Sequence, residues 1–466
     1  MTTTIQNKSR RSFLQGTLSL TASSAIAPWA LNFAAMSEAA AAGASDYKAL
    51  VCVFLYGGND YANTLVPYDT ANYANYQALR PNLAYSYASL ANTALSPVQT
   101  PVDASGAARQ YALAPELAPL MPIFNDGKMG VLLNVGNLIQ PTTKAQYLAN
   151  SVPLPSKLFS HNDQQSEWQS SGAEGTTSGW AGRMQDLLGT GNSNAIFSCV
   201  NVYGNAVFLS GLVANQYQIT ANGSVALNSA NSLFGSASAA RTLQSVMTST
   251  SMHPLESDYA NVMSQALSAN RSLTAALASA PVMSTPFPSG NSLADQLKMV
   301  ARTASVAQAL GVKRQVFFVA LNGFDTHDNL ATVHPQLLTS VSTALSSFYN
   351  ATVELGMSSA ITTFTASDFG RTLTVNNDGS DHGWGSMHFM LGGAVKGQRF
   401  YGIPPAVASN GPDDVGQGRL LPTTSVDQYA ATLGKWFGLT DAQLLNVLPN
   451  LSNYSAGLRN LGFMGS

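Results

Sequence analysis

The chain has 466 residues, of which 45% are hydrophobic, and its 22 basic and 24 acidic residues give a net charge of −2 at pH 7. A chain of this size can bury a large core in one or two domains. The balanced charge argues against a nucleic-acid partner, which would require a basic surface. Only 10% of the residues are charged, and such a composition is common in exported proteins.

The first 44 residues have the features of an export signal. The segment SRRSFL at residues 9–14 precedes an uncharged apolar stretch at residues 16–36, and Ala-x-Ala patterns near residues 40–44 offer cleavage sites. This order predicts a twin-arginine signal peptide. The alternatives are a chance Arg-Arg pair and a retained membrane anchor, although Ser, Thr and Pro in the apolar stretch argue against a stable span. We therefore expect passage through the twin-arginine export machinery, a periplasmic or secreted location and no membrane span after processing.

From residue 45 onward, apolar strand-like runs alternate with segments of helical spacing. Residues 204–292, rich in Ser, Ala, Asn and Thr, are predicted to form an inserted cap subdomain. The alternation predicts an α/β fold with a mostly parallel sheet and helices on both faces. Strands are predicted at residues 48–56, 129–135, 195–203, 314–321, 360–366 and 387–395, and helices at 113–126, 161–171, 179–188, 254–280, 291–310, 334–355 and 425–437.

The only two cysteines, Cys52 and Cys199, each lie in a strand-like apolar run. Thiols in such positions usually remain small core residues, although an oxidising compartment would permit a disulfide. The sequence contains no C-x-x-C motif, so it gives no sign of redox chemistry.

Three polar stretches that contain acids or imidazoles follow apolar runs. They are GGND at residues 57–60, GFDTH at 323–327, and SDFGR at 367–371, which leads to DHGWG at 381–385. Ligands of open α/β sheets bind beyond the carboxyl ends of the strands, where residues distant in sequence converge. Acids and imidazoles that meet there suit a divalent metal.

Several longer motifs carry a resemblance to a known family. They are LYGGND, LFSHNDQQ, NGFDTH, SDFGR, DHGWGSMHFMLGGAVKGQRFYG and TTSVDQYAATLGKWFGL. Together with the export signal, they resemble the exported domain-of-unknown-function family 1501, which is similar in turn to the alkaline phosphatase and sulfatase superfamily. The resemblance covers nearly the whole mature chain. It implies an alkaline-phosphatase-like α/β fold for residues 45–466 and hydrolysis of a small anionic phosphate or sulfate ester with the aid of divalent metals.

The resemblance also implies a set of metal ligands. Within it, Asp325 and His327 share one metal, although their spacing is tighter than the usual Asp-x-x-x-His, and Asp381 is either a ligand or the residue that orients His382. The plainer alternatives are a local Asn-Asp turn for Asp60 and a solvated loop for the pair Asp325 and His327. The implied ligands are Asp60, Asp325, His327, Asp368, Asp381 and His382.

The nucleophile implied by the resemblance is Ser160, which precedes a predicted helix and could equally be its N-cap. Arg371 would clamp anionic oxygens in bidentate fashion, or else be an arginine at the surface or at a helix end. Trp384 either walls the pocket or is a buried structural indole, and His388 is expected to be a packed core histidine.

Phe369 stands where the superfamily often has a metal-binding histidine. A phenyl ring cannot coordinate, so the second-metal position keeps only Asp60, Asp368 and at most Ser160. This suits a single metal, or a harder, oxygen-ligated ion such as Ca²⁺ or Mg²⁺, and the sequence leaves the identity of the divalent metal open among Ca²⁺, Mg²⁺ and Zn²⁺. The alternative function is a non-catalytic exported α/β protein that serves binding or structure. An esterase related to flavodoxin-like folds is disfavoured, because no Gly-Asp-Ser precedes Asn59.

Overall fold

The computed structural model describes residues 47–225, 229 and 231–465, so the predicted signal peptide lies outside the described residues. The central sheet contains β1 (Lys48–Tyr56), β4 (Met129–Gly136), β5 (Cys199–Asn201), β6 (Tyr217–Thr220), β7 (Gly223–Ser224), β8 (Arg314–Asn322), β9 (Ile361–Ser367), β12 (Ser386–Leu391), β13 (Arg399–Tyr401) and β14 (Thr424–Ser425). Its order is β13-β4-β12-β9-β1-β8-β5-β6-β7, with β14 paired to β4. Among the described helices, none is long and apolar enough to cross a membrane.

The middle of the sheet is parallel. Strand β1 pairs in parallel with β8 on one side and with β9 on the other, and β5 continues the parallel arrangement beyond β8. Strand β12 is antiparallel to both of its neighbours, β4 and β9. The sequence-based prediction of a mostly parallel α/β sheet is confirmed.

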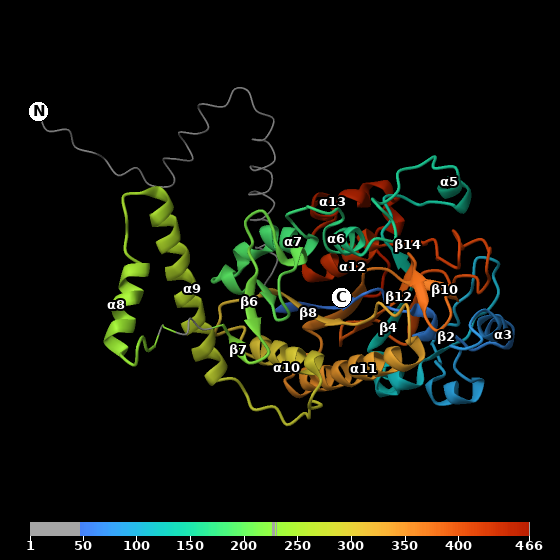
Figure 1. Ribbon diagram of the computed structural model, residues 1–466, viewed down its shortest axis with the longest axis horizontal. Helices are drawn as coiled ribbons and strands as arrows, with labels where there is room; N and C mark the ends of the chain where they lie inside the picture. The colour runs from blue at the N-terminus through green and yellow to red at the C-terminus, as the bar shows by residue number, and fades with distance from the viewer. Residues whose placement is uncertain (1–46, 226–228, 230, 466) are drawn as a thin grey trace, which may run out of the picture.

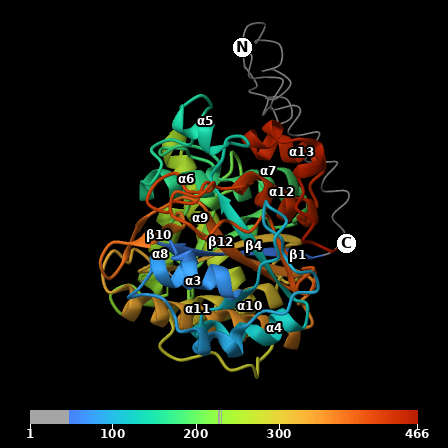
Figure 2. The ribbon, with the colours of Figure 1, turned by 90° about the vertical axis from the view of Figure 1, so that its right-hand side faces the viewer.

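Strand β1 is apolar on both faces because helices cover both sides of the sheet. Val51 and Val53 face a core built with α4 (Met121–Asn125), α10 (Ser292–Ser305) and α11 (Leu330–Glu354). Cys52 and Phe54 face the opposite core, to which α6 (His161–Ser170), α7 (Trp180–Leu188), α12 (Val426–Phe437) and α13 (Asp441–Val447) contribute. Figures 1 and 2 show the two helical layers on either side of the sheet.

The smaller elements surround this sandwich. They are α3 (Thr70–Leu79), α5 (Lys144–Leu148), the pair β2 (Leu65–Pro67) and β3 (Tyr111–Leu113), and the pair β10 (Arg371–Val375) and β11 (Ser380–His382). Both cysteines are buried and free, so they are core residues as expected.

One part of the segment predicted as an insertion adds strands to the central sheet, and another part lies outside the sheet. It contains β6, β7, α8 (Ala237–Met247) and α9 (Pro254–Ala278). Because β6 pairs with β5 and β7 folds back on β6, this hairpin extends the central sheet. Helices α8 and α9 then project from the body of the molecule (Figure 1).

Several predicted elements have other bounds in the structure: the helix predicted at 291–310 ends with α10 at Ser305, the helix predicted at 334–355 begins with α11 at Leu330, and the strand predicted at 387–395 ends with β12 at Leu391. Two further elements differ in kind or length. Residues 113–126 form a 3-10 helix at Pro115–Leu120 followed by the short α4, because the prolines of this segment lack the N–H groups that a longer α-helix needs. The strand expected at residues 195–203 shortens to β5, since a 3-10 turn occupies Ala195–Phe197. The predicted cap is present: Ser425 accepts from the Gln428 N–H at the start of α12.

Candidate metal centre

The neighbouring strands β9, β1 and β8 end at one edge of the sheet, and their loops form the floor of the candidate site. Gly57 and Gly58, which follow β1, have φ angles of +115° and +83°. A Cβ atom on Gly57 would overlap the backbone of Asp325, and one on Gly58 would overlap the ring of Phe369. Glycine at both positions therefore lets the three loops approach one another closely.

Acids and imidazoles from separate segments converge above this floor. One group of ligand atoms that lie within 4.8 Å of one another comes from His161, Asp325 and His382, and a second comes from His327, Asp381 and His382. Four of these five residues were predicted as ligands from the sequence. The fifth, His161, is the first residue of α6.

The atoms of this cluster lie close together around the Asp325 carboxylate. His327 Nε2 is 2.9 Å from His382 Nε2 and 3.0 Å from Asp325 Oδ1. His382 Nε2 is 3.4 Å from the same oxygen, and His161 Nε2 is 3.5 Å from Asp325 Oδ2. The Nε2 atoms of His327 and His382 thus meet one carboxylate oxygen of Asp325, and His161 Nε2 meets the other.

The rings of His382 and His161 are each oriented by a hydrogen bond at Nδ1, on the opposite side of the ring from Nε2. His382 Nδ1 lies 2.7 Å from the backbone oxygen of Phe159, and His161 Nδ1 lies 2.6 Å from Asp368 Oδ2. Each Nδ1 therefore carries a proton, which in the neutral ring leaves the Nε2 lone pair directed at the cluster. Histidines that bind metals in proteins are typically oriented by bonds of this kind.

The charges around the cluster favour a cation. The hydrogen bond that His161 donates to Asp368 raises the pKa of His161, with burial acting against it. Burial would raise the pKa of Asp325, but the hydrogen bond and charge of Arg371 prevail and hold it below its usual value. Burial lowers the pKa of His382 and so favours its neutral form, the form that binds metals.

A divalent ion fits the donor set for a further reason. His161 Nε2 is buried, yet among the described residues it has no hydrogen-bond partner. An unsatisfied buried nitrogen costs about 1–3 kcal/mol, which a bound cation would relieve. Asp381 Oδ1 lies 3.8 Å from His327 Nδ1, so it faces that ring from the side away from Asp325.

Two predicted ligands lie outside the cluster. Asp60 is 1% exposed, and its Oδ2 accepts from Arg80 at 2.6 Å and from the Ser380 hydroxyl at 2.7 Å. Burial would raise the pKa of Asp60, but the Arg80 charge and these bonds lower it. The Asp368 carboxylate is buried behind His161, where it also accepts from Gln165 Nε2 at 2.7 Å.

The residues predicted to act on the substrate have internal partners. The Ser160 hydroxyl, at the N-cap of α6, donates to Asp163 Oδ2 at 2.9 Å. Arg371 is fully buried and donates to Asp325 Oδ1 and to the Gly57 carbonyl, both at 2.9 Å. Its guanidinium therefore orients a candidate ligand from within the protein.

Three further residues are part of the packing around the site. Trp384 is 1% exposed and donates to the Asn137 carbonyl, and His388 is fully buried. The Phe369 ring lies beneath the cluster, with its centroid 4.9 Å from that of His161 and 4.8 Å from that of His382. A ring that supports two imidazoles thus occupies the position where the superfamily often has a metal-binding histidine.

Sequence reasoning did not propose His161 as a ligand. The signal was present in the motif LFSHNDQQ, in which His161 directly follows the proposed nucleophile. Only the pairing of His161 with Asp368, 207 residues away, gives this ring its orientation, and the local sequence does not contain that information.

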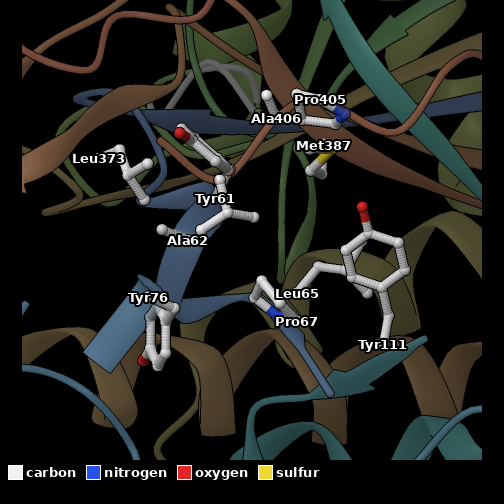
Figure 3. A pocket seen from close by; sticks show the side chains of 11 residues that line it. Tyr61, Ala62, Leu65, Pro67, Tyr76, Tyr111, Leu373, Met387, Pro405 and Ala406 are labelled. Atoms are coloured by element: carbon white, nitrogen blue, oxygen red, sulfur yellow. The ribbon is translucent and has the colours of Figure 1, made fainter. Parts of the chain in front are cut away.

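A separate small cavity of about 20 Å³ lies among apolar side chains from distant parts of the chain (Figure 3). Its walls include Tyr61, Leu65, Tyr111 and Met387 and contain none of the clustered acids and imidazoles. This volume has room for about one water molecule. The cavity is therefore part of the packing and separate from the candidate metal centre.

Comparison with known proteins places the chain in a family. A family model described as "Protein of unknown function (DUF1501)" matches residues 47–449. No curated protein matches the chain.

Solved structures show only distant likenesses. The crystal structure of Ps i-CgsB in complex with k-i-k-neocarrahexaose has 9% identity and a TM-score of 0.35, with 88% of this chain and 77% of that chain covered. A Bacteroides thetaiotaomicron structure, described under the metabolism of multiple glycosaminoglycans, has 11% identity and a TM-score of 0.33, with 86% and 74% covered. A mutant of the alkaline phosphatase PafA has 11% identity and a TM-score of 0.27, with 70% and 64% covered.

Proposed function

We propose that the chain, which belongs to the DUF1501 family, is an exported metal-dependent hydrolase of phosphate or sulfate esters. The observation that carries this proposal is the convergence of Asp325, His327 and His382 at the edge of the sheet, where the two ring nitrogens lie 2.9 Å apart and 3.0 and 3.4 Å from the same carboxylate oxygen. Their positions match the ligands that the resemblance to the alkaline phosphatase and sulfatase superfamily implies.

Asp325, His327 and His382 would hold the ion, with Asp381 beside His327. A divalent cation at such a site polarises an ester oxygen and lowers the pKa of a hydroxyl or a water molecule. The Asp325 side chain is 47% exposed and that of His327 is 37% exposed, so a small anionic ester has access to the site from solvent.

The start of α6 supplies the proposed nucleophile. Asp163 orients the Ser160 hydroxyl, and the unpaired backbone N–H groups at a helix N-terminus favour an anion beside it. Arg371 acts on the reaction through Asp325, whose carboxylate it holds in place.

Export belongs to the same proposal. Arg10 and Arg11, followed by the apolar stretch, would direct the folded chain through the twin-arginine machinery to the periplasm or the exterior. Replacing both arginines by lysine should leave the protein in the cytoplasm, as measured by cell fractionation. Unchanged export of that variant would remove this part of the proposal.

A non-catalytic exported protein that retains a structural metal is the second candidate. The observation that favours it is the internal pairing of two arginines near the site: Arg80 with Asp60, and Arg371 with Asp325. Neither guanidinium is positioned to hold the anionic oxygens of an ester.

The two candidates differ in turnover. We expect the purified mature chain to hydrolyse p-nitrophenyl phosphate or p-nitrophenyl sulfate, to lose this activity with a chelator and to regain it on addition of metal. Ser160→Ala should lower kcat with unchanged metal content, whereas Ser151→Ala, at an exposed serine nine residues earlier, should have no effect. A metal-loaded protein that turns over neither ester would favour the non-catalytic candidate.

A further inference from the structure

We propose that the site binds one ion, held by the Nε2 atoms of His161, His327 and His382 and by the Asp325 carboxylate, and that Asp368 positions His161. The inference rests on the proposed function, because it specifies how the same site holds its metal. It goes further by adding a ligand from α6 and by setting the number and class of the ion.

The number of ions follows from the residue that the two groups of candidate ligands share. Both groups contain His382. Its Nδ1 is engaged by the Phe159 carbonyl at 2.7 Å, so only Nε2 has a free lone pair. One lone pair binds one ion, and the two groups therefore describe two sides of a single site.

Four of the six spacings among these donors agree with one shared ion. Around a tetrahedral ion with bonds of about 2.0–2.1 Å, neighbouring ligand atoms lie about 3.3 Å apart. The distances from Asp325 oxygens to the nitrogens of His327, His382 and His161 are 3.0, 3.4 and 3.5 Å. The nitrogens of His327 and His382 are 2.9 Å apart.

His161 is the ligand that hydrogen bonding within the protein does not explain. The contacts of His327 with Asp325 and His382 form a self-contained network, but His161 Nε2 is buried without a hydrogen-bond partner among the described residues. Its Nδ1 is fixed by Asp368, which is itself fixed by Gln165 and by the Gly57 N–H. A ring whose Nδ1 is fixed, and whose Nε2 has no hydrogen bond but lies 3.5 Å from the Asp325 carboxylate, is oriented to bind a cation.

A second ion has no ligand set at the end of β1. Asp60 already accepts from Arg80, whose guanidinium supplies the positive charge beside this carboxylate. Phe369 offers no lone pair, and Asp368 is engaged by His161. Three imidazoles and one carboxylate suit a zinc-class ion, whereas Ca²⁺ and Mg²⁺ prefer sets made of oxygen alone.

The test measures metal binding and does not depend on catalytic activity. The chelator-treated mature chain is titrated with zinc and with cobalt(II), and the stoichiometry, affinity and visible cobalt absorption are recorded. The variants are His161→Ala, His161→Gln, Asp368→Asn, and His253→Ala as a matched control at an exposed histidine on the N-cap of α9. Far-UV circular dichroism establishes that each variant is folded.

We expect one ion per wild-type chain and an intense tetrahedral cobalt band. Asp368→Asn should weaken zinc binding about 10–100-fold, the usual effect of losing a residue that orients a ligand. Both His161 variants should weaken it more and change the cobalt band, and His253→Ala should change neither.

The outcomes separate this inference from the proposed function. Two ions per chain, or wild-type affinity in folded His161→Ala and His161→Gln, would overturn the inference and leave a metal-dependent site in place. A wild-type chain that binds neither zinc nor cobalt would overturn both. If His161→Ala does not fold, His161→Gln and Asp368→Asn decide the outcome.

Discussion

Asp60 and Asp325 follow the neighbouring strands β1 and β8, yet their surroundings differ sharply. Asp60 is 1% exposed and meets a guanidinium and a hydroxyl, whereas the Asp325 side chain is 47% exposed and faces three imidazoles. Both carboxyl groups have a lowered pKa, in each case because an arginine outweighs the effect of burial. A lowered pKa therefore does not distinguish a structural carboxylate from a candidate ligand.

The difference lies in what remains available on each carboxylate. The Asp60 oxygens accept from Arg80, from Ser380 and from the Asn63 N–H, all within the protein. On Asp325, Arg371 occupies one side, and the rest of the carboxylate faces the Nε2 atoms of three imidazoles. The carboxylate after β1 therefore has all its partners within the protein, whereas the carboxylate after β8 forms one side of a candidate binding site.

Breaking the ion pair should have the largest effect. Asp60→Ala leaves the Arg80 guanidinium buried without its carboxylate, and we expect a loss of about 3–5 kcal/mol in the free energy of unfolding. Metal content should stay unchanged. Urea denaturation and elemental analysis measure the two quantities.

The control for this change replaces both partners. An Asp60→Leu and Arg80→Met double variant should recover much of the lost stability, since no charge remains buried alone. The lowered pKa of Asp60 also means that its contribution to stability is present above its unfolded pKa and is lost as the pH falls. Loss of metal from folded Asp60→Ala would show instead that this carboxylate is a ligand.

Removing Asp325 should have the converse result. Asp325→Ala should abolish metal uptake and, although it removes the ion pair of the buried Arg371, leave the chain folded, because that guanidinium keeps its hydrogen bonds to the Gly57 and Ser380 carbonyls. Zinc at 100 times its Kd should stabilise the wild type by about 2.7 kcal/mol and should not stabilise this variant. Urea denaturation with and without zinc measures the difference. The control is Asp328→Ala, at an exposed carboxylate in the same loop, and equal zinc stabilisation of both variants would count against the site.

The sequence predicted where the loops of Asp60 and Asp325 lie, because the positions of the strands before them are encoded locally. The aliphatic run at residues 48–56 predicted β1 with the bounds that the structure has, and parallel strands had to bring their ends to one edge. This rule alone places Asp325 close to His327 and near the loop that carries His382. The same rule also predicts Asp60 as a ligand, because it concerns the course of the backbone and contains no information on side-chain partners.

The partners could not be predicted, because they depend on packing between distant segments. Arg80 lies on the C-cap of α3, and no local pattern indicates that it reaches back to Asp60. His161 depends in the same way on Asp368, which lies beyond β9. The motifs indicated which residue types meet at the edge, and the tertiary contacts decided which of them remain available to a metal.

Buried and accessible imidazoles also differ, and the difference should appear in how the free energy of unfolding depends on pH. Burial lowers the pKa of His388 to about 3, whereas Asp368 raises the pKa of His161. The unfolded chain binds a proton at residue 388 below about pH 6.5, but the folded chain does not, so stability falls as the pH is lowered. Between pH 7 and pH 5 this histidine should cost about 2 kcal/mol.

The measurement compares urea denaturation at the two pH values. His388→Gln should reduce the pH-dependent loss by about that amount, since glutamine does not titrate. His334, also fully buried with a pKa lowered to about 4, should retain its own contribution in this variant. His253→Gln, at an exposed position, should behave as the wild type does. An unchanged pH dependence in His388→Gln would mean that the pKa of this imidazole is the same in the folded and the unfolded chain.

The smallest effect is expected from Phe369, where the interior meets the site. Phe369→Leu keeps an apolar side chain against Gly58 and beneath His161, so we expect a loss of less than about 1.5 kcal/mol in stability. Metal stoichiometry should be unchanged at saturation, because the hydrogen bonds to Asp368 and to the Phe159 carbonyl still orient the two rings. Elemental analysis and zinc titration test this. Loss of the metal from folded Phe369→Leu would show that ring packing, more than hydrogen bonding, holds the imidazoles in place.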